Sequence, residues 1–479
     1  MYSAAVWMGT RFSREGGMAL GRVERERQGE LWVATDQIAR GAGHAFYDRL
    51  DQLLKEAGFD RFVEDLCEEF YQQGGRPGVP PGRYFRMLLV GYFEGITSQR
   101  GIAWRCGDSL SLRTFLGLAL TEQVPDHSSL TRIRNRLPLT VHEQVFAWML
   151  TLVEEHGLLS GKSVGIDSTL LEASAAMKSI VRKETGEDWK AYLKRLMLEE
   201  GVITEDDDPT DEDLRKFDKQ RAKSGKKKVS NDEWESPTDP DARIVRMKNG
   251  RTHLGYKAEH VVDLETDVIL SAQVHHGTEG DSQTLVLGVI DAQRNLIRSG
   301  SAAEIEEVAA DKGYHANEAI TECTRYGLRT YIPEPKSPHE RVWIDKPEEV
   351  ERAVVNNRRR SRRTKGRRLG RLRSEKVERS FAHLCDTGGA RRSWLCGLEK
   401  INKRYAIHAA AHNLAVLMRQ VFGIGKPRGL AAAWAAACAA LVALLRGCLG
   451  RLTLSPPIPR RSPPTLSRFL KQWAFSTGC

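Results

Sequence analysis

Apolar residues recur at helical spacing through the first third of the chain. Phe46, Leu50, Leu53 and Leu54 are spaced as on the buried face of an amphipathic helix. Similar spacing continues to about residue 160, and the Pro- and Gly-rich segment 76–82 interrupts it. The pattern predicts an all-helical N-terminal region.

Two places in this region carry the signals of a helix start. The Pro-Pro pair at 80–81 can open a helix at 84–95, because proline fits the first turn of a helix. Asp126 or Ser128 can cap a second helix that runs to Leu137. The second helix carries three basic residues, which are Arg132, Arg134 and Arg136.

From about residue 162 the pattern changes to short apolar runs, which indicate strands. Residues 163–167 form one such run, and residues 252–262 and 268–274 predict a β-hairpin. A further strand ends at Asp311, and residues 328–332 form another. Strands that alternate with helices predict an α/β fold around a mixed sheet.

Helices are expected between and after these strands. Asp281 is expected to cap the first of them, and residues 317–326 form the next. Glu378 lies in a third helical segment. Residues 405–421 predict a strongly amphipathic helix with one apolar face. The segment 178–249 is polar and highly charged, which is typical of an insertion that is partly helical and partly mobile.

The end of the chain is rich in alanine and then in proline. Its longest apolar run, residues 430–445, is shorter than the roughly 20 residues that a membrane-spanning helix needs, so we expect a docking helix and no membrane contact. Met18 offers a second start site, and the residues before it are expected to be a leader. The predicted organisation is a leader (1–27), a helical DNA-binding domain (28–160), an α/β domain with the insertion (161–428) and a tail (429–479).

The charge of the chain favours a polyanionic partner. The net charge is +10 and the isoelectric point is about 9.2, and most of the excess Lys and Arg follows Arg358. Nucleic acid is the commonest partner of such a protein. The eight cysteines include no Cys-x-x-Cys pair, which indicates reduced thiols and a cytoplasmic location.

Three acidic residues are the candidates for chemistry. Asp167 and Asp311 each end a short apolar run, and Glu378 lies on a later helix, with Glu375 one turn away as an alternative. Carboxylate oxygens are the ligands that Mg²⁺ prefers. Two carboxylates at strand ends and a third on a helix can hold two divalent cations over a phosphodiester.

In sequence and order, these segments resemble a bacterial insertion-sequence transposase of the DDE type. In the α/β region the matching text is VGIDST (164–169), YKAEH (256–260), ADKGY (310–314), VERSF (377–381), GGARR (388–392) and AAAHNL (409–414). In the helical region it is RPG (76–78), the helix that follows it, and PDHSSL (125–130). The resemblance covers roughly residues 28–428.

The resemblance implies an RNase H-like mixed sheet flanked by helices, after an all-α N-terminal domain. It implies that Asp167, Asp311 and Glu378 are catalytic and bind two Mg²⁺ or Mn²⁺ ions. The enzyme would cut the element's DNA ends and join their 3′-hydroxyls to target DNA. Its partners would be double-stranded DNA and a second copy of the chain in a synaptic complex, in the bacterial cytoplasm at the nucleoid.

The sequence departs from the family pattern around the third acid. Many relatives have Tyr, Arg and Lys there in the order Y-x2-R-x3-E-x6-K, and this chain has Arg371, Ser374 and Cys385. The phosphate contacts of those residues are therefore unassigned. The candidates to replace them are Arg373, Arg379 and Arg392.

Two basic segments are predicted to bind DNA. Residues 358–373, called here the basic stretch, precede Glu378, and contact with phosphates is favoured over a solvated linker. Its candidate residues are Arg358, Arg359, Arg360, Arg362, Arg363, Lys365, Arg367 and Arg368. The arginines of the 128–137 helix could recognise the element ends, and a packing helix with solvated arginines is the alternative.

Other candidates carry less weight. His275, His276 and His315 are expected to be packed or hydrogen-bonded, because Mg²⁺ prefers oxygen to imidazole. Trp234 could stack on a base but is expected to form a small local core. Two other functions stay open, namely a non-catalytic DNA-binding protein derived from a transposase and another two-metal nuclease.

Overall fold

The computed structural model describes residues 34, 43–72, 74, 78–223, 231–247, 250–336 and 343–427. The predicted leader (1–27) and tail (429–479) lie outside these residues. Within the described part of the chain, no helix has the length and apolar character needed to cross a membrane.

The first described segment is helical, as the apolar spacing predicts. Phe46, Leu50, Leu53 and Leu54 are all buried on the first helix. The helix expected at 84–95 begins with Pro81, and Asp126 caps the sixth helix by accepting a hydrogen bond from Ser129 N. The helices are α1 (Ala45–Glu56), α2 (Phe59–Cys67), α3 (Pro81–Glu94), α4 (Gln99–Asp108), α5 (Leu110–Phe115), α6 (His127–Arg136) and α7 (Leu139–Glu155).

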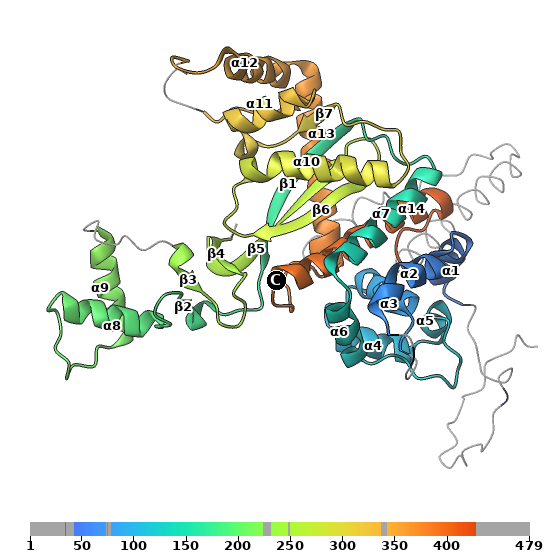
Figure 1. Ribbon diagram of the computed structural model, residues 1–479, viewed down its shortest axis with the longest axis horizontal. Helices are drawn as coiled ribbons and strands as arrows, with labels where there is room; N and C mark the ends of the chain where they lie inside the picture. Colours follow the sequence, from blue (N-terminus) through green and yellow to red (C-terminus); the bar gives the residue numbers. More distant parts are fainter. Residues whose placement is uncertain are drawn as a thin grey trace, which may run out of the picture. The chain divides into compact units, whose positions relative to one another are not determined.

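A mixed sheet follows α7 (Figure 1). Its strands are β1 (Ser163–Glu172), β4 (Arg243–Arg246), β5 (Thr252–Asp263), β6 (Ile269–His276), β7 (Glu307–Ala309) and β8 (Arg329–Tyr331). The order is β4-β5-β1-β7-β8, and β6 also pairs with β5. The pairs of β5 with β1, β4 and β6 are antiparallel, whereas β7 is parallel to β1 and to β8. This confirms the predicted RNase H-like α/β fold.

Helices cover both faces of the sheet (Figure 1). A Cβ atom at Gly165 of β1 would lie 3.1 Å from Val377, and one at Gly288 would lie 3.2 Å from Ile166. Because neighbouring strand residues point to opposite faces, Val377 and Gly288 belong to helices on opposite sides. These helices are α13 (Thr364–Phe381) and α10 (Asp281–Arg298).

The last described helix is α14 (Leu398–Phe422), and here the expectation of one apolar face is wrong. Its residues are buried almost all round between Ile401 and Met418. The helix packs against β6 and also against α3 and α7 of the helical region. A helix covered on every side needs no polar face, and residues from both regions belong to one hydrophobic core.

The polar insertion forms ordered elements beside the sheet. They are β2 (Val181–Arg182), α8 (Trp189–Glu199), α9 (Asp211–Lys223) and β3 (Trp234–Glu235), and β4 completes the segment. Trp234 is buried and packs edge-on against Tyr192, with Arg182 over its ring. The prediction of a small local core around Trp234 is therefore confirmed.

Two helices pack beside β8 at one edge of the sheet. They are α11 (Asn317–Arg325) and α12 (Glu348–Arg362), and α12 leads directly into α13. The short helical turns are η1 (Glu68–Phe70), η2 (Met177–Ser179), η3 (Asn231–Glu233), η4 (Lys312–Tyr314) and η5 (Ala382–Thr387).

Candidate active site

Asp167 lies on β1, and Asp311 follows the neighbouring strand β7 by two residues. The parallel register pairs Val164 with Val308 and Gly165 with Ala309. Continued by two residues, this register places Asp311 opposite Asp167. Adjacent strands are about 4.8 Å apart, and the printed pairing ends at Gly165 and Ala309, two residues before each acid.

Local structure orients the side chain of Asp311. Asp311 caps η4, and one of its carboxylate oxygens accepts a hydrogen bond of 2.7 Å from Gly313 N. A Cβ atom at Gly313 would lie 3.0 Å from that oxygen and 2.8 Å from an oxygen of Asp281. The carboxylates of Asp281 and Asp311 therefore both crowd the position where a larger residue would place its side chain.

Asp167 has a cationic partner from α13. Arg373 Nη1 donates to Asp167 Oδ2 at 2.5 Å, and both side chains are mostly buried, with 14% and 19% of their surface exposed. The contact is possible because Gly165 has no side chain, so α13 packs closely on β1 beside it. The guanidinium of Arg373 thus occupies a position on the Asp167 carboxylate that a metal ion could otherwise take.

Glu378 lies on the same helix, but its side chain is exposed. Lys376 and Arg379 both reach Asp267, in the turn that lies beside the first residues of β1. Because an α-helix turns about 100° per residue, Glu378 lies on the other flank of α13.

The alternative residue, Glu375, is already paired. Its carboxylate accepts a hydrogen bond from Arg379, which also binds Asp267. Glu378 has no hydrogen bond or ion pair within the residues that the structure describes. The free carboxylate of Glu378 is therefore the better candidate for a ligand.

The three acids do not form a finished metal site. Among the described residues, no group of three His, Cys, Asp or Glu side chains is close enough together to hold a metal ion. The predictions that Asp167, Asp311 and Glu378 are metal ligands and catalytic residues therefore stay predictions.

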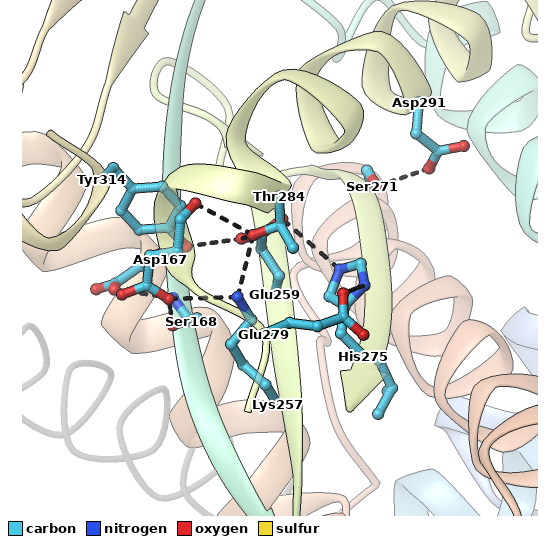
Figure 2. A network of polar contacts seen from close by, with 12 residues as sticks. Asp167, Ser168, Lys257, Glu259, Ser271, His275, Glu279, Thr284, Asp291 and Tyr314 are labelled. Atoms are coloured by element: carbon cyan, nitrogen blue, oxygen red, sulfur yellow. Dashed lines mark hydrogen bonds and ion pairs between the residues drawn. The ribbon is translucent and has the colours of Figure 1, made fainter. Parts of the chain in front are cut away.

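A buried polar network lies on the other face of β1 and β5 (Figure 2). Glu259 is only 2% exposed, and one of its oxygens accepts hydrogen bonds from Thr284 (2.6 Å) and Tyr314 (2.8 Å). Its other oxygen has no hydrogen-bond partner and lies 3.8 Å from His275 Nε2. Burial and the neighbouring Glu259 raise the pKa of Tyr314 well above its usual value.

Lys257 connects this network to Asp281. Its ammonium donates to Thr284 at 3.1 Å and lies 3.4 Å from Asp281, which also accepts a hydrogen bond of 2.8 Å from Ser168. The prediction that Asp281 caps α10 is wrong, because the cap is Gly280. The interaction of Asp281 with Ser168 and Lys257 replaces the local capping bond.

Sequence reasoning assigned no role to Lys257, Glu259 or Asp281. The sequence does contain a pattern that indicates Lys257 and Glu259. They are charged residues two positions apart in β5, so they share one face of a strand that is otherwise largely apolar. A charged pair facing the covered side of a sheet needs partners there. No local pattern distinguishes Asp281 from an ordinary helix cap.

Of the three arginines proposed to replace the missing family residues, one reaches a candidate acid. Arg373 pairs with Asp167, whereas Arg379 pairs with Asp267 and Arg392 lies over the ring of Trp394. At the position of the family lysine, Cys385 is buried, and burial raises the pKa of its thiol to about 11.

The basic stretch is helical, so the linker alternative is wrong. It covers the end of α12 and the first part of α13. Several of its cations bind protein groups: Arg358 pairs with Glu334 at 2.7 Å, Lys365 with Glu307 at 2.5 Å, and Arg360 donates to Thr330 O at 3.2 Å. Those three predicted DNA contacts would compete with existing interactions.

Other arginines of the basic stretch are exposed and carry no ion pair within the described residues. They are Arg359, Arg362, Arg363, Arg367, Arg368 and Arg371. These side chains are available to phosphates without breaking any contact.

The arginines of α6 differ in exposure. Arg132 and Arg136 are exposed, with Arg132 bonded to Ser129 and Arg136 over the ring of Tyr71. Arg134 is only 9% exposed. A surface contact between Arg134 and duplex DNA therefore does not fit the structure.

The histidines behave as expected for packed residues. His276 Nδ1 contacts Asp241 O at 2.8 Å, and His275 lies 3.6 Å from Glu279. His315 also takes part in a polar interaction.

Two family models match the chain. Residues 34–136 match one described as "Transposase domain (DUF772)", and residues 211–414 match one described as "Transposase DDE domain". The second match contains Asp311 and Glu378, and Asp167 precedes it. No curated protein and no solved structure matches the chain significantly.

Proposed function

The chain belongs to the DDE transposases of insertion sequences, and we propose that it cuts the DNA ends of its element and joins their 3′-hydroxyls to target DNA. The observation that supports this proposal is that β1, which carries Asp167, pairs in parallel with β7, which ends two residues before Asp311. Glu378 lies on α13, which packs on β1. The family implies that DNA is the partner.

The residues present fit a site for divalent cations. Asp167, Asp311 and Glu378 offer the hard oxygen ligands that Mg²⁺ or Mn²⁺ prefers. Arg373 already neutralises Asp167, which indicates that this carboxylate needs a positive partner. Asp311 has no basic partner in the described part of the chain. Bound ions would polarise the phosphodiester and lower the pKa of the attacking oxygen.

The side chains of this protein have separate tasks in such a reaction. Asp167 is held by β1 and Asp311 by its capping bond to Gly313 N, so in this proposal they define the position of the scissile phosphate. Glu378 lies on an exposed flank and has to turn toward them when the site is filled. Arg373 has to release Asp167 at that moment, and its guanidinium can then pair with a phosphate oxygen. Water and a DNA 3′-hydroxyl attack phosphorus in the same in-line way, so one site serves both steps.

Binding of the DNA backbone is assigned to the free arginines of the basic stretch. Phosphate contacts position DNA but carry no sequence information. Recognition of the element's ends therefore needs other residues, and the exposed Arg132 and Arg136 of α6 are our candidates. Joining two ends requires two active sites, so we expect a homodimer in the synaptic complex.

Substitution of the acids tests the proposal. Asp167→Ala, Asp311→Ala and Glu378→Ala should each lower cleavage of labelled element ends in Mg²⁺ by about a hundredfold or more. DNA affinity, measured by a mobility shift, should stay unchanged. Asp291→Asn is a matched control, since this carboxylate of α10 accepts a hydrogen bond from Ser271 of β6, away from the site.

The products distinguish the alternatives. Cleavage with strand joining supports the transposase, cleavage without joining supports another two-metal nuclease, and binding alone supports a non-catalytic relative. If Glu378→Ala stays active and Glu375→Ala is inactive, the third metal ligand is Glu375 and not Glu378.

A further inference from the structure

A cavity that no part of the proposed reaction uses lies between the helical region and α14. Its volume is about 170 Å³, and a hydrogen-bonding water needs only about 10–15 Å³ of such space. The cavity is therefore large enough for a phosphate group with its hydration. Its lining comes from α3, α4, α6, α14 and the loop at 394–395.

Two arginines of the lining lack an acidic partner. Arg134 is 9% exposed, its Nε has no hydrogen-bond partner, and no carboxylate pairs with it within the described residues. Arg404 donates to His408 Nε2 at 3.3 Å and to Gly389 O at 3.3 Å, which are both uncharged groups. Burial and the charge of Arg134 lower the pKa of Arg404 to about 10.

The unbalanced positive charge calls for an anion. Burying one unpaired charge costs several kcal/mol, and two guanidiniums that repel each other increase that cost. His408 Nδ1 also has no hydrogen-bond partner. Because its other nitrogen accepts from Arg404, this Nδ1 carries the proton, and the ring stays neutral beside the two guanidiniums.

A helix end and an aromatic ring complete the lining. Residues 97–99 line the cavity where α4 begins, and the N-terminus of a helix attracts anions. Trp394 also lines the cavity and is 56% exposed, with Arg392 5.0 Å from its ring centre. An exposed indole beside an anion site can stack on a base.

We propose that this cavity binds a backbone phosphate of a DNA strand, with the adjoining base stacked on Trp394. The proposal rests on the proposed function, because it takes DNA as the substrate. The lining residues that carry it are Arg134, Arg404, His408 and Trp394.

The position of the loop relative to β1 fits a strand that also occupies the acidic site. Glu172 of β1 pairs with Arg392, two residues before Trp394. Glu172 lies five residues after Asp167, which corresponds to about 17 Å along a strand. A DNA strand advances about 3.4 Å per nucleotide.

Binding of a short oligonucleotide tests the proposal without any cleavage. A labelled 12-nucleotide single strand is titrated with the full chain in EDTA, and affinity is read from fluorescence anisotropy. Trp394→Ala should weaken binding about fivefold or more through lost stacking. Arg404→Gln should weaken it at least as much. Arg61→Gln, an exposed arginine of α2, is the matched control and should change nothing.

The exposed position of Trp394 keeps the test valid if Arg404→Gln fails to fold, which thermal unfolding will show. Unchanged affinity in Trp394→Ala overturns the proposal. Inorganic phosphate is titrated separately. Phosphate could bind the wild-type protein and not the Arg404→Gln variant, while the oligonucleotide binds the two proteins equally. In that case the cavity is a site for free phosphate and the DNA assignment is wrong.

Failure of the proposed function gives a different result. If Asp167→Ala still cuts DNA, the catalytic assignment falls, but the oligonucleotide affinities above are unaffected because they are measured without metal. If cleavage follows the acids while Trp394→Ala binds normally, only the cavity proposal falls.

Discussion

Arg373 is the residue that most affects how the acidic site works. Its ion pair with Asp167 joins positions 206 residues apart, so it forms only when α13 packs on β1. The pair stabilises the ionised carboxylate of Asp167, which would otherwise be repelled by nearby carboxylates without a compensating positive charge. It also competes with any metal ion for the same carboxylate.

Replacement of this arginine should separate the two effects. Arg373→Gln should lower the free energy of unfolding of the metal-free protein by about 1–3 kcal/mol, because a charged hydrogen bond is lost. Mg²⁺ should then raise the melting temperature more in the variant than in wild type, since Asp167 no longer has to release a guanidinium. An equal or smaller Mg²⁺ effect would contradict this competition. Arg325→Gln, which loses its pair with Glu349 on the surface away from the site, is the control.

At this scale the sequence reveals the acids but not their partners. Asp167 and Asp311 follow apolar runs that are visible locally, so the strands before them are predictable. The prediction that Asp167 ends its strand is wrong, because β1 continues to Glu172. Lys257, Glu259 and Arg373 gain their importance from contacts with distant residues. Spacing along the chain carries no information about such contacts, and the Asp281 prediction failed for the same reason.

The key contact at the scale of elements is that of α13 with β1. Gly165 allows it, because a Cβ atom there would lie 2.8 Å from Leu264 and 3.0 Å from Arg373 Cγ. The approach of this helix sets the position of both Arg373 and Glu378. A small change at Gly165 should therefore affect stability and chemistry together.

Two glycine-to-alanine changes make a matched pair. Gly165→Ala should destabilise the protein by about 1–3 kcal/mol through overpacking. Gly370→Ala, within α13 and with no atom near its added methyl group, should stabilise it by up to about 1 kcal/mol through helix propensity. Denaturant unfolding measures both. A neutral Gly165→Ala would show that α13 can move away from β1 without cost.

The basic stretch offers a second comparison between like residues. Arg362→Gln removes a free arginine and should reduce the salt dependence of duplex binding, by up to about 0.9 in the slope of log K against log salt. Arg358→Gln removes the same charge from a residue that is paired with Glu334, so its slope should stay near that of wild type. Affinities at several salt concentrations measure this, and equal slopes would make pairing irrelevant.

The elements themselves were largely predictable, with α14 as the instructive failure. Local spacing indicated the helices, the hairpin and the strand that ends at Asp311. The same spacing gave α14 one apolar face, although Ile401 to Met418 are covered all round. The cover comes from α3 and α7, hundreds of residues earlier, and periodicity within the helix cannot show it.

For the whole molecule, the most consequential feature is a set of buried neutral histidines. His142, His260, His408 and His412 are all nearly inaccessible, and burial lowers the pKa of each. His142 contacts Tyr84 OH and Pro138 O, both at 3.1 Å, and its pKa falls to about 4. Protonation of these rings therefore opposes the folded state.

The effect on stability has a definite direction. The unfolded chain takes up protons at about pH 6.5, well above the folded pKa of His142. Stability should be complete above pH 6.5 and fall toward pH 4, by about 1.4 kcal/mol per pH unit for each such ring. Denaturant unfolding between pH 7 and pH 5 measures the fall. His142→Gln should make it shallower, and an unchanged pH dependence would exclude His142 as a contributor.

The burial of α14 has a consequence for the evolution of this chain. A helix that contributes to the interior of both the helical and the α/β regions ties their sequences to each other. Exchange of the first 160 residues for those of a distant relative would leave α14 facing a foreign surface. Chimeras joined at that point should precipitate unless α14 is exchanged with them, so these regions are expected to be inherited as a unit.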